Sequence, residues 1–439
     1  MKRHPLIGLE FRKILRRDTK NHGNAFIEDS EKPQALDDDI WSFSIFFTGY
    51  PHVWSVYQPY VMEQAGWSQS QASLCFYLAL AAFVFGNIVG GRMQDKKNPR
   101  LVVFIGGAVF TAGIILSSFL IIPSPIPMYV TYGVMQGFGQ GMIYTTIIST
   151  AQKWFPGRTG FASGIVVTAN GLCGFFLAPI SRILLEKTGA SGTLLAVGIV
   201  IGISWILSSI FFYVPDDNWR MDMERKLTKQ SGDSRAHAVK EYTSGEMMKT
   251  KRFYYLLATM LFGLISYFLV SPVSQTYQIS MGIPASVAVS AVMIGSVVNA
   301  STRLILPTIA DKAGRIVCIK IVIVVSIVAM AVLSLTGSYS ITAAIIVMYG
   351  CYGGIMGSFP SFTSSIFGME HSGENYGYVM FGIVIATFGA PALTSFITGK
   401  GMGMQMVFAA GAVFAAVALI CLILLEKDIK KSSDNTLTK

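Results

Sequence analysis

The chain has 439 residues, of which 52% are hydrophobic and 13% are charged. Soluble domains carry about 25% charged residues, so this composition argues against a soluble protein and for a chain embedded in a membrane. The formal net charge of +10 at pH 7 would suit a nucleic-acid-binding protein, but the distribution of the basic residues along the chain excludes that class.

The apolar residues form twelve windows of about 20 residues, each long enough to cross the hydrocarbon core of a bilayer. A polar tail (1–40) precedes them, a polar linker (215–252) divides them six and six, and a second tail (426–439) follows. The sequence therefore predicts an all-α membrane protein with two six-helix bundles, at 41–214 and 253–425. The predicted spans lie near 41–63, 71–93, 101–122, 127–149, 159–183, 192–214, 253–275, 286–309, 317–336, 340–366, 375–398 and 405–425.

The basic residues indicate the orientation of these spans. If the N-terminus is cytoplasmic, 30 of the 34 Lys and Arg residues lie in the tails and the cytoplasmic loops. By the positive-inside rule both termini then face the cytoplasm, and we expect the protein to lie in the cytoplasmic (plasma) membrane. The basic excess thus reflects the membrane topology. We expect the protein to interact with the lipid bilayer and not with nucleic acid. Of the four other basic residues, Arg182 and Lys187 lie at the outer end of span 5 and Lys400 in the last outer loop, so that Arg303 is the one near the middle of a span.

The two halves resemble each other in sequence. Tyr132 and the glycine after it, in span 4, match Tyr349 and the glycine after it, in span 10, at an offset of 217 residues. Asp95, after span 2, matches Asp311, after span 8, at an offset of 216 residues. An internal duplication of six-span halves is typical of transporters that rock about a binding site in the middle of the membrane.

Short motifs indicate a family. The loop after span 2 carries Gly91, Asp95, Lys96 and Arg100 at the spacing of the loop signature of the major facilitator superfamily, which the chain resembles. Three further runs are similar to its branch of oxalate/formate antiporters and monocarboxylate transporters: HVWSVYQPYVMEQAGWSQSQAS (52–73), KWFPGRTGFASGI (153–165) and NYGYVMFG (375–382). The resemblance implies the twelve-helix fold of that superfamily and secondary active transport by alternating access.

Arg303 lies near the middle of span 8, where an arginine costs about 2.5–3.5 kcal/mol on insertion scales. Such a residue serves function, extends its side chain to the cytoplasmic interface or makes a purely structural bond to a helix end, and these interpretations stay open. In the branch that the chain resembles, the matching arginine is thought to bind the substrate carboxylate. The planar guanidinium group of an arginine can donate two parallel hydrogen bonds to the two oxygen atoms of a carboxylate.

Two departures from the branch favour a monoanion as substrate. Asn299 stands where the monocarboxylate transporters have Asp, and Ile383 stands where oxalate carriers have a second cation, a Lys. One fixed positive charge balances a monoanion better than a dianion. The resemblance therefore implies a small organic monoanion of the monocarboxylate type.

The energy coupling depends on the groups that can hold a proton inside the membrane. All 24 Asp and Glu residues lie in tails, loops or span ends, so the spans offer no carboxylate for a proton relay. His52, in span 1, is the intramembrane group that titrates near neutral pH. It neutralises the anion, carries a coupled proton or only packs. Exchange of one organic anion for another and proton-linked symport both fit the sequence.

Polar and aromatic residues at helical spacing are further candidates for the substrate site. Gln136, Gln140 and Tyr144 share one face of span 4, and a polar stripe in a span is expected to face water or another helix. Trp54 and Tyr57 share a face of span 1, although aromatic stripes often serve packing alone. The predicted substrate site also contains Arg303, His52 and Asn299.

The repeated loops predict a gate at the cytoplasmic ends of spans 2 and 8. Similar residues in the superfamily form salt bridges that close the inner side, and we expect Arg158 to pair with Asp95. The alternative is that these charges only fix the topology and cap helices. Both roles are compatible, since surface ion pairs contribute about 0–1 kcal/mol each and a gate must be marginal. The predicted gate residues are Asp95, Lys96, Arg100, Arg158, Asp311, Lys312 and Arg315.

The sequence thus favours a secondary carrier of a small organic monoanion, with a coupled proton or a counter-anion as second solute. Two alternatives stay open: a carrier of bulkier amphipathic compounds, such as bile-acid-like carboxylates or drugs, and a sensor that binds a metabolite without moving it. The sequence contains no Walker motif, metal cluster or Ser/His/Asp arrangement, so we expect no enzyme activity, no cofactor and no metal. We expect a monomer.

Overall fold

The computed structural model describes residues 46–96, 98–210, 212–215, 240–335 and 339–437, apart from the side chains of His52 and of 432–437. The predicted N-terminal tail and most of the predicted linker lie outside this part of the chain. The side chain of His52, for which a role was predicted, also lies outside the described part of the chain. Every regular element among the described residues is a helix.

The N-terminal half supplies six spans. Its first span is built from η1 and α3, and its fourth from α6, η2 and α7, where η2 is a π-helical segment. Its fifth and sixth spans form α8, which turns back at Gly189, whose φ of 67° suits a residue without a Cβ atom. The bounds are η1 Tyr50–Val53, α3 Trp54–Ala65, α4 Gln69–Lys96, α5 Pro99–Phe119, α6 Ile126–Met128, η2 Tyr129–Gln136, α7 Gly137–Trp154 and α8 Thr159–Ile210.

The C-terminal half begins with a short helix, α10, in the predicted linker. Its first span is interrupted at Pro272, where α11 gives way to η3 and α12, because proline cannot donate the backbone hydrogen bond of a helix interior. The bounds are α10 Ser244–Met247, α11 Lys251–Val270, η3 Ser271–Val273, α12 Ser274–Ser280, α13 Ala285–Ala313, α14 Arg315–Leu335, α15 Ser340–Phe367, α16 Ser372–Val379, α17 Phe381–Gly399 and α18 Met404–Leu437.

Each of the twelve predicted spans contains helix. Nine helices among the described residues are long and apolar enough to cross a membrane. One of the nine, α8, holds two spans, and the interrupted helices η1–α3 and η2–α7 account for the other two. The predicted fold class, an all-α membrane protein with twelve spans in two bundles, is therefore confirmed.

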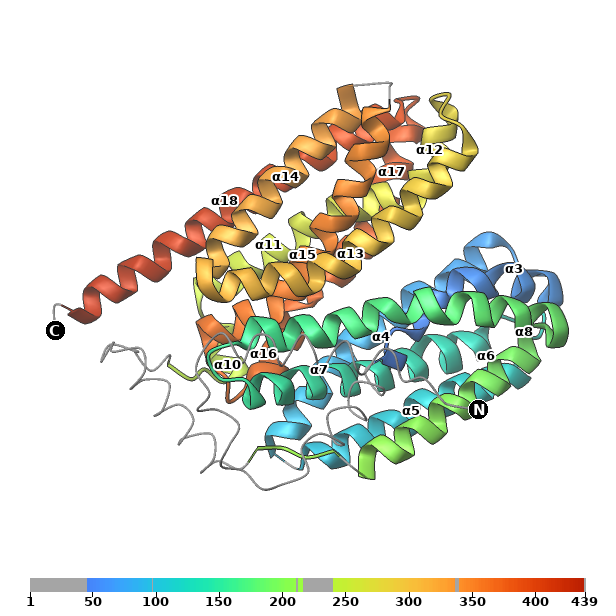
Figure 1. The fold of residues 1–439 in the computed structure, drawn as a ribbon, viewed down its shortest axis with the longest axis horizontal. Coiled ribbons are helices and arrows are strands. Elements are labelled where there is room, and N and C mark those ends of the chain that lie inside the picture. The colour runs from blue at the N-terminus through green and yellow to red at the C-terminus, as the bar shows by residue number, and fades with distance from the viewer. Residues whose placement is uncertain (1–45, 97, 211, 216–239, 336–338, 438–439) are drawn as a thin grey trace, which may run out of the picture.

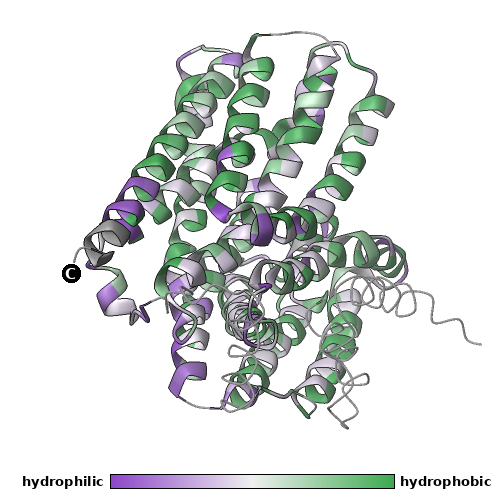
Figure 2. Ribbon diagram, turned by 60° about the vertical axis from the view of Figure 1, so that its left-hand side comes forward, coloured by the Kyte–Doolittle hydropathy of each residue, from purple (hydrophilic) through white to green (hydrophobic). Residues whose placement is uncertain are grey.

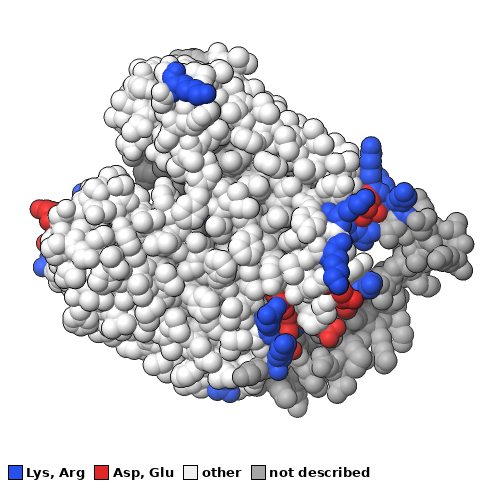
Figure 3. All heavy atoms as spheres, turned by 180° about the vertical axis from the view of Figure 1, so that it is seen from behind, with Lys and Arg blue, Asp and Glu red and all other residues white. Residues whose placement is uncertain are grey.

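The two halves form two bundles that lie at an angle to each other. Figure 1 shows the N-terminal bundle in blue to green and the C-terminal bundle in yellow to red. The bundles meet at the end where α10 and α16 lie, here called the closed end, and diverge toward α3 and α12, here called the open end. Figure 3 shows from behind that a notch separates the two lobes at the open end, whereas most of the visible charged side chains gather at the closed end.

The outer surface of both bundles is apolar. Large side chains such as Phe119, Ile203 and Val413 are more than half exposed. Figure 2 shows mainly hydrophobic residues along the lengths of the helices. Soluble proteins rarely expose apolar surface this extensive, so these side chains face lipid, as the composition predicts.

Candidate substrate site and gate between the two halves

Arg303 lies on α13 where the two halves meet. Its side chain is buried, with 4% of the residue exposed. Its Nε donates to Oδ1 of Asn299, one turn earlier on the same helix (2.9 Å). Its Nη1 donates to the carbonyl oxygen of Val167 (3.2 Å) and to Oδ1 of Asn170 (3.4 Å), both on α8 of the other half. The side chain therefore reaches across to the N-terminal half and does not extend along α13 to the interface.

Tyrosines from both halves surround the guanidinium of Arg303. The ring of Tyr352 on α15 lies 5.6 Å from Cζ, within range of a cation–π interaction, and Tyr267 on α11 stacks on Tyr352 with ring centroids 4.0 Å apart. Tyr144 on α7 and Tyr376 on α16 also lie within electrostatic reach of the guanidinium. A single cation thus sits among four phenol groups that can donate hydrogen bonds.

Two donors at this place are available to a ligand. The hydroxyl of Tyr376 is buried and lies near that of Tyr144, but it makes no hydrogen bond of ordinary length within the described part of the chain. Nη2 of Arg303 likewise donates to none of the described residues. A buried donor without an acceptor costs about 1–3 kcal/mol, which applies to the Tyr376 hydroxyl, and an anion at Nη2 would gain a charge-assisted bond that the protein leaves open.

Glycines let the neighbouring helices approach Arg303 closely. A Cβ atom at Gly171 would lie 2.9 Å from Nη1 of Arg303, so the guanidinium uses the space that a side chain there would occupy. On the other side, a Cβ atom at Gly357 would lie 2.3 Å from the carbonyl oxygen of Arg303, and one at Gly353 would lie 2.2 Å from that of Asn299. The pair on α15 thus packs directly on the turn of α13 that carries the predicted Asn299–Arg303 pair.

Hydrogen bonds connect this site to Gln140, one of the predicted site residues. Nε2 of Gln140 donates to the carbonyl oxygen of Thr48 (2.5 Å), and Nδ2 of Asn170 donates to Oγ1 of Thr48 (3.0 Å). Asn170 in turn accepts from Arg303. These bonds place Gln140 in the polar network around Arg303, and a role of Gln140 and Tyr144 in substrate binding stays a prediction. The connecting residues Thr48 and Asn170 were missed, because neither stands out in a single sequence.

Gln136 lies elsewhere, inside the N-terminal bundle. Its backbone packs against α5, where a Cβ atom at Gly113 would lie 2.6 Å from the backbone nitrogen of Gln136. Both polar atoms of its side chain are buried without a hydrogen-bond partner among the described residues. Gln136 lies one turn before Gln140, at the junction of η2 and α7, and at this level of the span the side chain is enclosed by the N-terminal bundle, with 0% of the residue exposed.

Trp54 and Tyr57 also lie inside the N-terminal bundle. The ring of Trp54 lies 4.4 Å from that of Tyr132, and its Nε1 donates to the carbonyl oxygen of Ala72 (3.1 Å). The hydroxyl of Tyr57 lies 3.0 Å from Oγ of Ser181. These contacts give the two aromatic residues the packing role that was the alternative interpretation of their stripe.

At the closed end, the C-terminal half binds the start of α8 through Asp311. The carboxylate accepts from the backbone N–H groups of Gly160 (3.0 Å) and Phe161 (2.9 Å), where the helix dipole favours a negative charge. Nη2 of Arg315 donates to Asp311 and to Oγ1 of Thr159, both at 2.8 Å. These bonds join the two halves, as the gate prediction requires of Asp311 and Arg315.

The corresponding residue of the N-terminal half, Asp95, has a different partner from the one expected. Its Oδ2 lies 3.4 Å from Nδ1 of His371, which precedes α16, rather than near Arg158. Arg158 is exposed next to the start of α8, the end that Asp311 caps. Lys96 and Lys312 are exposed as well, and Nε of Arg100 donates to the carbonyl oxygen of Ser209 within the same half (2.7 Å), which fits the topology and capping alternative.

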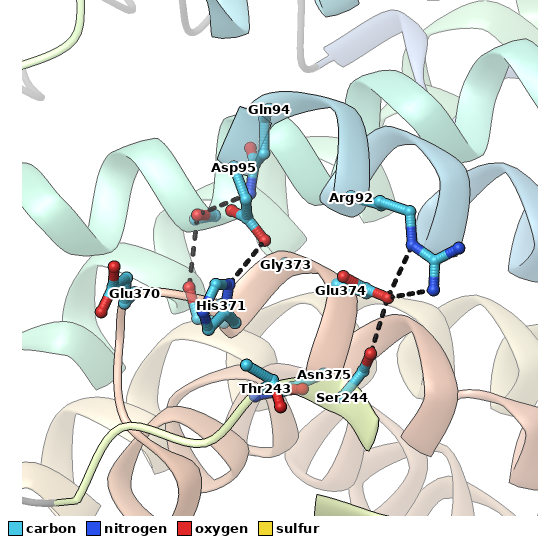
Figure 4. A network of polar contacts seen from close by, with 12 residues as sticks. Arg92, Gln94, Asp95, Thr243, Ser244, Glu370, His371, Gly373, Glu374 and Asn375 are labelled. Carbon is cyan, nitrogen blue, oxygen red and sulfur yellow. Dashed lines mark hydrogen bonds and ion pairs between the residues drawn. The ribbon is translucent and has the colours of Figure 1, made fainter. Parts of the chain in front are cut away.

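A short ion pair between the halves involves residues that the sequence did not single out (Figure 4). Glu374 on α16 is 7% exposed, and its Oε1 accepts from Nε and Nη2 of Arg92 on α4 (3.0 and 2.9 Å) and from Oγ of Ser244 on α10 (2.7 Å). Glu374 and Arg303 are the two charged residues that are buried in the described part of the chain. The pair was missed because its partners lie 282 positions apart.

The end of the predicted linker is bound to the turn between α15 and α16. The carboxylate of Glu241 accepts from the backbone N–H groups of Met369 (3.1 Å) and Glu370 (2.9 Å). The backbone N–H of Tyr242 donates to Phe367 (3.0 Å). Since this turn leads directly into the gate residues His371 and Glu374, the linker helps to hold them against α4.

Removing the Glu241 carboxylate is expected to free the turn. In a Glu241→Ala variant, amide hydrogen exchange at Met369 and Glu370 should speed up by about fivefold, the effect of losing about 1 kcal/mol of local stability. The measurement is exchange followed by mass spectrometry on the purified protein. Unchanged exchange at both amides would mean that the linker contact contributes nothing.

Glu246→Ala is the matched control for that experiment. Glu246 lies on the same segment, but its carboxylate binds the backbone N–H and hydroxyl of Thr243 in a capping box, which lowers the pKa of Glu246. Its loss should loosen α10 and leave the two amides of the turn at their original rate.

Comparisons with known proteins agree with this architecture. The family described as Major Facilitator Superfamily matches residues 40–386. The chain is 27% identical over 361 residues to the oxalate:formate antiporter of Oxalobacter formigenes, which covers 81% of this chain and 80% of that protein. It is 30% identical to human monocarboxylate transporter 11 over 123 residues, 28% of this chain and 26% of that protein.

Among solved structures, FucP in the outward conformation superimposes with a TM-score of 0.65 at 12% sequence identity, over 89% of this chain and 98% of that one. The proton:xylose symporter XylE superimposes with a TM-score of 0.64 at 13% identity, over 89% of this chain and 94% of that one. At this identity the likeness concerns the fold alone.

Proposed function

The chain belongs to the Major Facilitator Superfamily of multi-pass membrane transporters, and on that premise we propose that it is a secondary active transporter of a small organic monoanion. Alternating access moves the anion across the cytoplasmic membrane, in exchange for another anion or together with a proton. Arg303 binds the carboxylate, and the tyrosines around it complete the site.

The observation that carries this proposal is the charge balance between the two halves. Arg303 is buried without a carboxylate partner among the described residues, whereas the other buried charge, Glu374, is neutralised by Arg92. Arg303 is therefore a buried cation whose hydrogen-bond partners in the described part of the chain are all neutral oxygen atoms, and a monoanion would balance its charge. Buried cations are costly when unpaired, so binding such an anion is favourable.

The names of the relatives support a small carboxylate as the substrate class. The antiporter that matches over most of the chain exchanges oxalate and formate according to its name, and the local match is to a monocarboxylate transporter. A dianion such as oxalate fits less well, because Ile383 is apolar and buried where a second cation is expected in oxalate carriers.

The contacts at the closed end support a rocker-switch mechanism. We take this end to be cytoplasmic, as the distribution of Lys and Arg predicts, so that the structure represents a carrier with its inner side shut. The bonds of Asp311, Asp95 and Glu374 across the halves then form the inner gate. Individual pairs of this kind are weak, so a modest gain from substrate binding is enough to change the balance between the two conformations.

Counterflow with purified protein in liposomes tests the substrate class. We expect labelled formate, acetate or lactate to enter vesicles loaded with the same anion, and unlabelled short monocarboxylates to compete. Oxalate and a bulky bile-acid carboxylate should compete about tenfold more weakly, a difference of about 1.4 kcal/mol, because the second charge or the larger body finds no partner at Arg303.

Acetamide is the matched control for acetate, since it has the same shape without the charge, and it should not compete. Preferential uptake of bulky amphipathic compounds would favour the alternative of a carrier for such molecules. Binding of a short acid without any uptake would favour the sensor.

A further inference from the structure

Arg303 is surrounded by neutral oxygen atoms that differ in how they are attached. Asn299 lies on the same helix and moves with Arg303, whereas Val167 and Asn170 lie on α8 in the other half. The bond to Asn170 is the longest of the three, at 3.4 Å, and long hydrogen bonds are weak. Asn170 is therefore the acceptor that a ligand displaces most easily.

The amide of Asn170 is held in a fixed orientation. It is 5% exposed, and its Nδ2 donates to Oγ1 of Thr48, so that Oδ1 is directed at Arg303. The backbone of the first span packs against it: a Cβ atom at Gly49 would lie 1.9 Å from the carbonyl oxygen of Asn170. Asn170 thus presents an oxygen to the guanidinium at the edge where a carboxylate oxygen would bind.

We propose that Asn170 is a positioning residue that takes the place of the substrate in the empty carrier. Its amide oxygen satisfies Nη1 of Arg303 until an anion arrives, and the anion then binds Nη1 and Nη2 together as a fork. This inference rests on the proposed function and adds to it the residue that competes with the substrate for Arg303.

The placement of Asn170 has a consequence for coupling. Because Asn170 belongs to the opposite half, its bond to Arg303 lasts only while α8 and α13 are in contact around these two residues. The empty carrier is held in the conformation of the structure, and an anion releases Arg303 from α8. Exchange of one anion for another is favoured over the return of an empty carrier.

Two variants of Asn170 are expected to change anion affinity in opposite directions. Asn170→Asp has nearly the same shape but adds a negative charge beside Arg303, so the KM for acetate in counterflow should rise by about tenfold or more. Asn170→Ala removes the competitor, so the KM should fall by about fivefold. A purely structural role would raise the KM or lower the rate in both variants, and that result would overturn the proposal.

A second measurement does not depend on the identity of the substrate. Spin labels at the exposed ends of α4 (Ser70) and α12 (Ser280), in a full-length chain whose five cysteines are replaced by alanine, report the separation of the halves at the open end. In the absence of anion, the long-distance population should increase in Asn170→Asp and decrease in Asn170→Ala, relative to the unsubstituted pair.

The two measurements separate this inference from the proposed function. If no monocarboxylate is taken up, the proposed function fails, and the distances still decide whether Asn170 holds the halves through Arg303. If uptake proceeds but both variants shift the distances in the same direction, or leave them unchanged, Asn170 does not take the place of the substrate. The proposed substrate class then still stands.

Discussion

Substituting Arg303 with glutamine is expected to lower the counterflow of a short monocarboxylate by about a hundredfold or more. Hydrogen bonds from a charged donor contribute about 1.5–3 kcal/mol each, and a carboxylate held by the fork would lose two of them. Glutamine keeps a polar group of moderate size at the position but removes the charge that the monoanion balances. The measurement is uptake of labelled acetate into proteoliposomes that contain equal amounts of inserted protein.

Arg303→Lys is expected to fail to a similar extent. An ammonium group carries the charge, but it cannot donate at the same time in the directions of Asn299, of α8 and of a ligand, as the planar fork does. Arg182→Gln is the matched control, because Arg182 is 73% exposed and pairs with Glu186 on the surface. Wild-type uptake by the glutamine variant of Arg303 would show that the anion binds elsewhere.

The features of this molecule that follow from local sequence were predictable. Span positions depend on runs of apolar residues, and the Asn299–Arg303 pair depends on a separation of one helical turn. Both could therefore be derived without knowing which other helices pack against them. The placement of Asp311 at a gate followed from the internal repeat, and the structure adds what it binds, the first backbone amides of α8.

The partners that lie far apart in the chain could not be predicted in the same way. Asn170 meets Arg303 across 133 positions, and Glu374 meets Arg92 across 282, and no spacing rule connects such residues. Gln136 illustrates a second limit: helical spacing indicates which residues share a face, but the sequence does not show that the bundle encloses this turn of the span, where Gln136 packs against Gly113 of α5. The residues that make up the site could therefore be identified only from the tertiary structure, whereas the fold could be predicted from the sequence.

The two halves use their repeated loops in related but unequal ways. Asp311 at the end of α13 caps the start of α8, and Asp95 at the end of α4 faces His371 at the start of α16. In both cases a carboxylate of one half lies at the N-terminus of a helix of the other half, where the helix dipole favours it. The second contact is reinforced by Glu374, whose ion pair with Arg92 joins the two halves, whereas the ion pair of Asp311 is with Arg315 of its own half.

Reversing the charge of Glu374 is expected to open the inner gate and to lower transport by about tenfold. In Glu374→Lys an ammonium group would face Arg92, and a buried charge without a partner costs about 3–5 kcal/mol. Arg92 is 54% exposed and can turn toward water, so the expected effect is smaller than that cost. Spin labels at Ser70 and Ser280 should show the long-distance population decreasing, because the closed end no longer holds the halves together.

Combining Glu374→Lys with Arg92→Glu restores opposite charges at the same place and should recover most of the transport and of the long-distance population. Each single variant leaves two like charges opposite each other, whereas the double variant again has one of each, so the effects of the two changes should not add. A double variant as impaired as the product of the two single variants would show that Glu374 and Arg92 act independently. In that case the closed end would be held mainly by the backbone contacts of Asp311, and the ion pair of Figure 4 would be incidental to the gate.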